Sequence, residues 1–348
     1  MATEYPVMAR GPWREVVALF VRLGFTAFGG PAAHIAMMRQ EVVTRRKWLS
    51  DAHFVDLLGA VNLIPGPNST ELGIYLGYLR AGWPGLIAAG LGFIGPAMLI
   101  VLGIAWAYVQ FGALPAVGWF LYGIKPVVVA IIAQALWGLA GTVPRDWWLG
   151  LIGIAVLVGF IGGLNTVALL LIPGALGLLV VALRRRGATP AGMVALVQGH
   201  WLTIAGGMAS VSLLTLFLNF LKIGAVLYGS GYVLLALLHD TFVAQLHWLT
   251  DRQLLDAISV GQFTPGPVFT TATFVGYLVG GVPGALVATL GIFLPAFVFV
   301  PLIHPLVVRL RRSPLLAGFL RGVNVAALAL MAGVVVQLGH AALIDPLT

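Results

Sequence analysis

Long apolar runs, separated by short polar or glycine–proline segments, make up most of this chain. An α-helix needs about 20 apolar residues to cross about 30 Å of hydrocarbon, and several of these runs reach that length. Because they follow one another with short connections, they predict a bundle of membrane-spanning helices. The predicted spans are residues 84–109, 116–141, 147–163, 165–183, 190–212, 283–306 and 313–340.

Two glycine–proline segments interrupt the first part of the pattern, at Gly29-Gly30-Pro31 and at Pro65-Gly66-Pro67. Proline removes a backbone donor and glycine loosens the backbone, so each run ends one helix and allows another to begin. We therefore predict broken helices that fold as re-entrant hairpins at these points.

The composition supports a membrane protein: 60% of the 348 residues are hydrophobic, 9% are charged, and the mean hydropathy is +1.02. No stretch is polar enough for a soluble domain. The absence of cysteine excludes disulfides, thiolate metal sites and cysteine catalysis. A net charge of +8 would suggest a nucleic-acid partner in a soluble protein. Here the cations gather in loops between apolar runs, so the predicted environment is a lipid bilayer and no nucleic acid is expected.

The chain contains two copies of one pattern, because residues near 20–70 recur near 220–270 at an offset of 200. Pro65-Gly66-Pro67 matches Pro265-Gly266-Pro267, and Asp56 matches Asp256. After one deletion the offset becomes 199, and Pro96 then matches Pro295. An internal repeat of this length predicts two structurally related halves.

Basic loops alternate between the copies, which predicts that the second copy is inverted in the membrane. Arg45-Arg46-Lys47 corresponds to the neutral segment Gln245-Leu246-His247, whereas the basic loop 309–312 corresponds to neutral residues 110–113. Since lysine and arginine collect on the cytoplasmic side, the N-terminus is expected inside. The predicted units are an N-terminal repeat (13–145), linking transmembrane helices (146–212) and a C-terminal inverted repeat (213–345).

Four cations lie within the apolar segments, where a charge costs about 2.5 to 3.5 kcal/mol and usually faces a cavity or a partner. Arg22 and Lys222 occupy equivalent positions of the two copies, and Lys125 and Arg321 lie three positions apart in register. Equivalent residues of inverted repeats tend to meet near the midplane, where substrates bind. Four cations and few acids suggest an anion site, although ion pairing for packing is an alternative interpretation.

Each Pro-Gly-Pro break is bordered by hydroxyl or amide side chains, and the helix that follows offers free N–H groups and the positive end of its dipole. Such helix starts can bind a tetrahedral oxyanion. The alternative is a simple kink whose hydroxyls bond back to the preceding turn. The candidate anion-binding residues here are Gly66, Asn68, Ser69, Thr70, Thr264, Gly266, Thr270 and Thr271.

Three carboxyl groups within helices are candidates for proton coupling: Glu71, after the first break, and the repeat-related pair Asp56 and Asp256. His34 and Glu41 lie a heptad apart, close to Arg39, in a group that would serve either function or structure.

Other chemistry is not indicated. Gly90-x-Gly92-x-x-Gly95 fits a dinucleotide-binding pattern but lies inside an apolar span, where close helix packing explains it better. The histidines lack metal-site spacing, and no nucleotide-binding loop is present, so neither a cofactor nor a metal nor an enzyme is expected.

The stretches at 27–43, 62–83 and 261–281 resemble the chromate ion transporter family, in its two-domain, long-chain version, and the match covers nearly the whole chain. This resemblance implies a bacterial inner-membrane protein that exports chromate, coupled to the proton motive force, and confers chromate resistance. It also implies sulfate as a second substrate, since sulfate has the same shape and charge.

The residues and the resemblance together suggest that a dianion binds between the two broken-helix starts, Arg22 and Lys222, while Glu71 or an aspartate carries the proton. A sulfate or other oxyanion importer and an anion channel remain the alternatives. Spacings of GxxxG at Gly73 and Gly77, and at Gly276 and Gly280, predict either intramolecular contacts or a homodimer.

Overall fold

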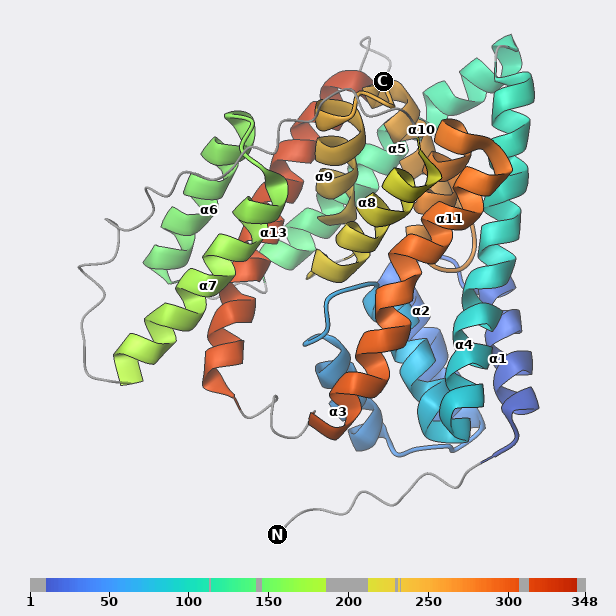
Figure 1. The fold of residues 1–348 in the computed structure, drawn as a ribbon, viewed down its shortest axis with the longest axis vertical. Coiled ribbons are helices and arrows are strands. Elements are labelled where there is room, and N and C mark those ends of the chain that lie inside the picture. Colours follow the sequence, from blue (N-terminus) through green and yellow to red (C-terminus); the bar gives the residue numbers. More distant parts are fainter. Residues whose placement is uncertain are drawn as a thin grey trace.

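The computed structural model describes residues 11–112, 114–141, 146–185, 212–228, 231, 233–306 and 313–342, and every regular element within these ranges is a helix (Figure 1). The first half contains α1 (Trp13–Thr26), α2 (Gly30–Arg39), the π-helix η1 (Gln40–Arg45), α3 (Asp51–Val61), α4 (Asn68–Phe111), α5 (Pro115–Ala140), α6 (Trp147–Ile161) and α7 (Thr166–Arg185). The second half contains α8 (Leu213–Val226), α9 (Val233–Leu238), η4 (His239–Gln245), α10 (Asp251–Phe263), η5 (Val268–Thr270), α11 (Thr271–Ile303), η6 (His304–Leu306) and α13 (Pro314–Ala342).

Five helices in the described part are long and apolar enough to cross a membrane, which confirms the prediction of an all-α, multi-pass membrane protein. Helix α6 covers the expected span at 147–163 but is a shorter apolar helix. The predicted linking span 190–212 and the basic loop 309–312 lie outside the described residues, apart from residue 212. The five candidate spans are Asn68–Phe111, Tyr122–Ala140, Thr166–Arg184, Val268–Leu306 and Pro314–Gly339.

The two glycine–proline segments of the first half, Gly29-Gly30-Pro31 and Pro65-Gly66-Pro67, separate helices where the sequence predicts it. Helix α1 ends at Thr26 and α2 begins at Gly30, after Gly29 takes the left-handed backbone angle φ of 99°. Helix α3 ends at Val61, and α4 begins directly after Pro67. The first two helices and the next two are therefore joined at glycine–proline turns, as expected.

Helix α4 contains a second interruption, which lies just before the start of the span predicted at 84–109. Ala81 (φ −140°, ψ 21°) and Gly82 (φ 61°, ψ −146°) leave helical geometry and separate an arm that starts at the break from a longer arm. The two arms touch, because a Cβ added to Gly77 would meet the carbonyl oxygen of Gly85. Helix α11 has the same interruption at Gly280 and Gly281, with angles within a few degrees of those in α4.

The small residues Gly77 and Gly276 therefore make intramolecular contacts, one of the two roles predicted for the GxxxG spacings. Gly276 lies against the Gly284 carbonyl, as Gly77 lies against Gly85. No side chain fits at either crossing, since the backbones of the two arms approach each other directly. A homodimer stays a prediction.

We expect Gly77→Ala to lower stability by about 1 to 3 kcal/mol, because the added methyl group must force two backbones apart. Gly95→Ala is the matched control, since Gly95 lies in the same helix with open space around its Cα. Thermal unfolding in detergent measures both. Equal melting temperatures for the two variants would contradict the close crossing at Gly77.

The two halves share their hydrophobic cores. Val101 and Ala105 of α4 belong to the core built mainly from the second half, whereas Ala296 and Val300 of α11 belong to the core of the first half. Helices α4 and α11 pack side by side, and Figure 1 shows their long arms running in opposite directions. Each half is thus completed by the long helix of the other.

The glycines of the rejected dinucleotide pattern confirm close packing for two of the three positions. A Cβ on Gly90 would meet the ring of Phe297 in α11, and one on Gly92 would lie 3.3 Å from the Cβ of Phe20 in α1. These glycines therefore let α1 and α11 approach α4.

Candidate functional site

Each Pro-Gly-Pro loop forms a hydrogen bond with the opposite half of the molecule. The Gly66 N–H donates to the Leu227 carbonyl, just after α8, at 2.6 Å, and the Gly266 N–H donates to the Ala27 carbonyl, just after α1, at 2.8 Å. The two donors are 200 positions apart in sequence, and so are the two acceptors. We call Pro65-Gly66-Pro67 the first break and Pro265-Gly266-Pro267 the second break. Each break is thus bonded, across the interface, to the residue that follows the first helix of the opposite half.

Glycine is required at both of these positions. Gly66 and Gly266 have φ of 141° and 84°, in the region where side chains are strained. A Cβ on Gly266 would also lie 2.5 Å from the Cβ of Ala97 and 3.1 Å from the carbonyl oxygen of Gly24. The second break therefore packs directly on the backbone of the first half.

Glu71 is fully buried in the first turn of α4, beside the first break. A Cβ on Gly66 would meet its carboxyl group. Neither carboxyl oxygen has a hydrogen-bond partner among the described residues. Burial of an unpaired carboxylate is costly, whereas the neutral acid costs much less.

His34 links the two breaks, a role that the sequence analysis does not assign. Its Nε2 lies 3.2 Å from the Ala27 carbonyl, the same oxygen that accepts from Gly266, and its Nδ1 lies 3.3 Å from the Ser69 hydroxyl. A carbonyl only accepts, so Nε2 carries the proton, and in the neutral ring Nδ1 accepts from Ser69. A chain of hydrogen bonds thus runs from the start of α4 to the second break.

Four of the other five hydroxyl and amide candidates have local partners. Thr264, Thr270 and Thr271 donate to carbonyl oxygens of their preceding turns, at 3.0, 2.8 and 2.8 Å. Asn68 donates to Asn62 at 2.8 Å. The Thr70 hydroxyl is buried with no hydrogen-bond partner in the described part of the chain. Their role in anion binding stays a prediction, and Thr70 and Ser69 lie closest in sequence to Glu71.

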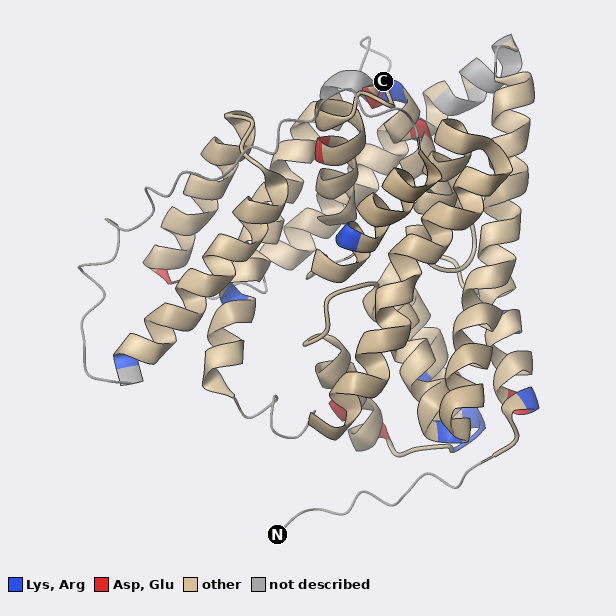
Figure 2. Ribbon diagram, viewed as in Figure 1, with Lys and Arg blue, Asp and Glu red and all other residues tan. Residues whose placement is uncertain are grey.

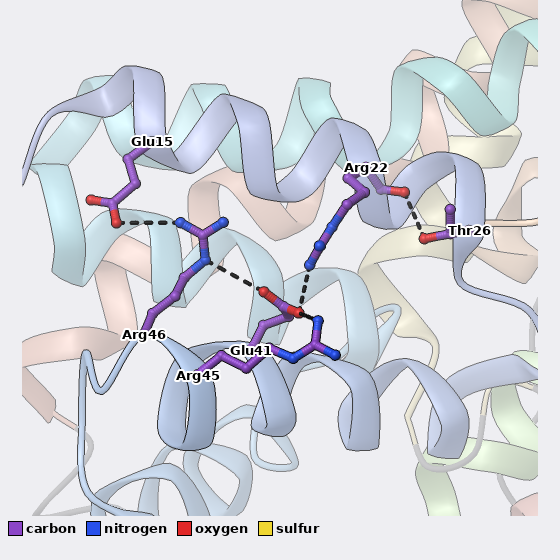
Figure 3. Close-up of polar contacts among 6 residues, drawn as sticks. All are labelled: Glu15, Arg22, Thr26, Glu41, Arg45 and Arg46. Atoms are coloured by element: carbon purple, nitrogen blue, oxygen red, sulfur yellow. Dashed lines mark hydrogen bonds and ion pairs between the residues drawn. The ribbon is translucent and has the colours of Figure 1, made fainter.

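Arg22 and Lys222 have different surroundings. Arg22 forms an ion pair with Glu41 at 2.5 Å (Figure 3), which matches the alternative interpretation for this cation. Lys222 is exposed on α8, and within the described ranges it forms no ion pair. The difference follows from the sequence, because position 241, which corresponds to Glu41, is Thr241.

His34, Arg39 and Glu41, which the sequence suggests as one group, have separate partners in the structure. His34 points to the breaks, Glu41 binds arginines, and Arg39 pairs with Asp51 through two contacts of 2.5 and 2.8 Å.

A buried ion pair joins the two halves. Lys125 of α5 lies 2.8 Å from Oδ1 of Asp256 in α10, and the Tyr108 hydroxyl of α4 donates to Oδ2 at 2.8 Å. The side chains of Lys125 and Asp256 are 8% and 1% exposed. Arg321, the other predicted cation of the later spans, is exposed on α13, and Asp56, the counterpart of Asp256, is half-buried on α3. The structure thus pairs a predicted anion-binding residue with a predicted proton carrier.

Comparison with known proteins gives consistent matches. The model of the family described as Chromate transporter matches residues 14–211 and 214–348. A chromate transport protein of Cupriavidus metallidurans is 36% identical over 95% of this chain and 84% of its own length. A probable chromate transport protein of Synechococcus elongatus is 33% identical, over 95% and 86%. A chromate transport protein of Pseudomonas aeruginosa is 30% identical, over 97% and 84%. No solved structure matches this chain.

Proposed function

This chain belongs to the chromate transporter family, a family of transporters and not of enzymes, and from that premise we propose that it exports chromate across the bacterial inner membrane in exchange for protons. In this role it would confer resistance to chromate. Sulfate, which is also a tetrahedral dianion, is proposed as a second substrate.

The proposed architecture is a pair of inverted repeats, 13–145 and 213–345, joined by linking helices at 146–212. The reciprocal hydrogen bonds of Gly66 and Gly266 and the opposite directions of α4 and α11 support it. Figure 2 shows more lysine and arginine at the end of the molecule where α1 begins. By the positive-inside rule this end would face the cytoplasm, together with the N-terminus.

The observation that carries the proposal is that each break bonds across the interface between the halves, with the buried Glu71 beside the first break. The carboxyl oxygens of Glu71 have no hydrogen-bond partner among the described residues. In inverted-repeat transporters, substrate and coupling ion bind at such an interface, and relative movement of the halves exposes them to either side. The dianion would bind the polar groups at the two breaks, with intramembrane cations nearby. The proposed binding residues are Gly66, Asn68, Ser69 and Thr70 at the first break, Thr264, Gly266, Thr270 and Thr271 at the second, and the cations Arg22, Lys222, Lys125 and Arg321.

Glu71 is the proposed proton carrier, with Asp56 and Asp256 as the other carboxyl candidates. A dianion and a carboxylate repel each other strongly in a buried site. Protonation of Glu71 would remove this repulsion, so the proton and the anion affect each other's binding. Such mutual dependence couples anion flux to protons, and the sign of the response to a pH gradient establishes whether the two move in exchange or together.

We expect Glu71→Gln to abolish the response of chromate flux to a pH gradient, because glutamine has nearly the shape of glutamate but cannot exchange a proton. Purified protein in liposomes loaded with labelled chromate provides the assay, with wild-type efflux faster when the outside is more acid. Asp51→Asn, which removes an exposed carboxylate paired with Arg39, is the control and should respond as wild type does. A Glu71→Gln variant that still responds to the gradient would remove Glu71 from the coupling mechanism.

The same liposomes distinguish the alternatives. An anion channel would never accumulate chromate against its electrochemical gradient, and an importer would accumulate it on the side that faces the cytoplasm. Unlabelled sulfate, molybdate and chromate, compared as competitors at two pH values, would establish whether sulfate shares the site.

A further inference from the structure

Glu41 is the centre of an ionic cluster at the end of the molecule where α1 begins. Its carboxylate is 7% exposed and contacts three guanidinium groups: Arg22 of α1 at 2.5 Å, Arg45 at 2.7 Å and Arg46 at 3.4 Å. Figure 3 shows Arg22 extended from α1 toward Glu41, with Arg45 and Arg46 approaching from the end of η1. One carboxylate thus forms ion pairs with three cations.

Glu15 holds the outer part of this cluster in place. It accepts from Arg80 at 2.8 Å, from Arg46 at 3.3 Å and from the indole N–H of Trp48 at 3.2 Å. The guanidinium groups of Arg46 and Arg80 also lie over the Trp48 ring, 5.6 and 5.1 Å from its centroid. Arg46 and Arg80 are therefore fixed by several contacts.

Arg22 and Arg45 are held less firmly. Both pair with Glu41, and their side chains are 47% and 57% exposed. A guanidinium offers five N–H donors, so each retains donors that a second acceptor can use. An anion can therefore bind these two arginines while Glu15 keeps Arg46 and Arg80 in place.

The charge of the cluster suits a dianion. Four arginines (Arg22, Arg45, Arg46 and Arg80) face two carboxylates (Glu15 and Glu41), which leaves two positive charges in excess. Guanidinium groups bind oxyanions through paired, charge-assisted hydrogen bonds.

Arg22 also connects the cluster with the breaks. The Arg22 carbonyl accepts from the Thr26 hydroxyl at 2.8 Å in the last turn of α1. Ala27 follows Thr26, and its carbonyl accepts from the Gly266 N–H and lies within hydrogen-bond distance of His34. The Arg22 backbone thus lies roughly 7.5 Å along α1 from Ala27, the residue that accepts from the second break.

The second half lacks this cluster. Lys222 remains at the position of Arg22, but neutral residues replace the others: Thr215, Thr241, Gln245, Leu246 and Val279 stand at the positions of Glu15, Glu41, Arg45, Arg46 and Arg80. At these matching positions the second half therefore offers one lysine and no carboxylate.

We propose that Arg22 and Arg45 form a capture site for tetrahedral oxyanion dianions at this end, and that Glu41 is an exchangeable competitor, displaced when the anion binds and returning to Arg22 when it moves on. The inference rests on the proposed transport function and adds to it an access site on one face. Glu41 keeps the arginines from retaining the anion, so it lowers affinity and speeds release.

Chromate KM measured separately from each face, in liposomes with uniformly oriented protein, tests this capture site. For Glu41→Gln, KM at the face bearing the cluster should fall by about tenfold and the maximal rate should also fall, because loss of one charged competitor is worth about one charge-assisted hydrogen bond. Arg22→Gln should raise KM at that face by about tenfold for the same reason. In both variants KM at the opposite face should stay within about twofold of wild type.

Arg22→Lys keeps the charge without the paired donors and should give an intermediate KM, which tests the site if Arg22→Gln does not fold. Asp51→Asn breaks the neighbouring exposed pair with Arg39 and should leave KM unchanged at both faces. A Glu41→Gln KM equal to wild type, or shifted equally at both faces, would overturn the capture site. Wild-type protein that carries no chromate would refute the proposed function instead, and the same variants then test the capture site with sulfate.

Discussion

Replacing Lys125 with methionine is expected to destabilise the folded protein by about 3 to 5 kcal/mol, since it would leave the Asp256 carboxylate buried without a cation. Methionine fills most of the volume of the lysine side chain, so the loss measures the charge and not a cavity. Reversible unfolding in mixed detergent micelles would give the free energy of unfolding. The pair joins α5 to α10, so its loss should also loosen the contact between the halves.

Arg321→Met is the control for this experiment, because Arg321 is a cation of the matching helix α13 that is exposed. Its effect should be within about 0.5 kcal/mol of wild type. The double variant Lys125→Met, Asp256→Leu removes both charges and should recover most of the lost stability. A Lys125→Met variant as stable as the control would show that Asp256 is satisfied in another way.

Transport by the double variant separates the two interpretations of this pair. If Lys125 and Asp256 serve packing alone, a refolded double variant should carry chromate at the wild-type rate. If Lys125 binds the anion or Asp256 carries a proton, flux should fall although the fold is intact. Stability and flux measured on one preparation therefore establish whether Lys125 and Asp256 serve packing alone or also transport.

Local chemistry made the breaks and the starts of the long arms near residues 84 and 283 predictable, but it left open whether the glycines of the short arms contact the same chain. Pro65-Gly66-Pro67 stops a helix through covalent geometry, so the pattern alone locates it. The turn at Ala81 and Gly82 takes two residues and lies within an apolar run, and both of its arms are apolar. The span predicted from residue 84 begins directly after this turn, but no local pattern shows that the two arms then pack against each other at Gly77 and Gly85.

The ion pairs could not be predicted because their partners lie far apart in the sequence. Arg22 and Glu41 meet because the hairpin of α1 and α2 brings them together, and Lys125 meets Asp256 only when the two halves assemble. Burial of charges in the membrane correctly indicated that these cations need partners or a cavity. Comparing the copies, in which Thr241 replaces Glu41, was the signal that could have pointed to an ionic cluster in one half only.

The role of His34 could not be predicted from the sequence for a different reason. A buried histidine on an apolar helix has many roles, and its link to the second break depends on the Ala27 carbonyl, a backbone group that no side-chain pattern reveals. The corresponding residue, Leu234, lacks polar side-chain atoms, so the link exists in one half alone.

Gly266→Ala is expected to destabilise the protein by about 2 to 5 kcal/mol, the sum of about 1 to 2 kcal/mol for a left-handed backbone and about 1 to 3 kcal/mol for crowding. The new methyl group would lie 2.5 Å from the Cβ of Ala97, and relief of that contact would pull the Gly266 N–H away from Ala27. Both unfolding and chromate flux should therefore report the change.

Gly163→Ala separates the two contributions, because Gly163 has a similar φ of 74° in the turn between α6 and α7 but open space around its Cα. It should show only the backbone cost and retain flux. Gly66→Ala should be milder than Gly266→Ala, since the group that it meets is the end of the Glu71 side chain, which can rotate, and not a neighbouring backbone. If Gly266→Ala cost no more than Gly163→Ala, the second break would not pack against the first half as closely as its hydrogen bond to Ala27 implies. The proposed binding site between the breaks would then lose its geometric basis.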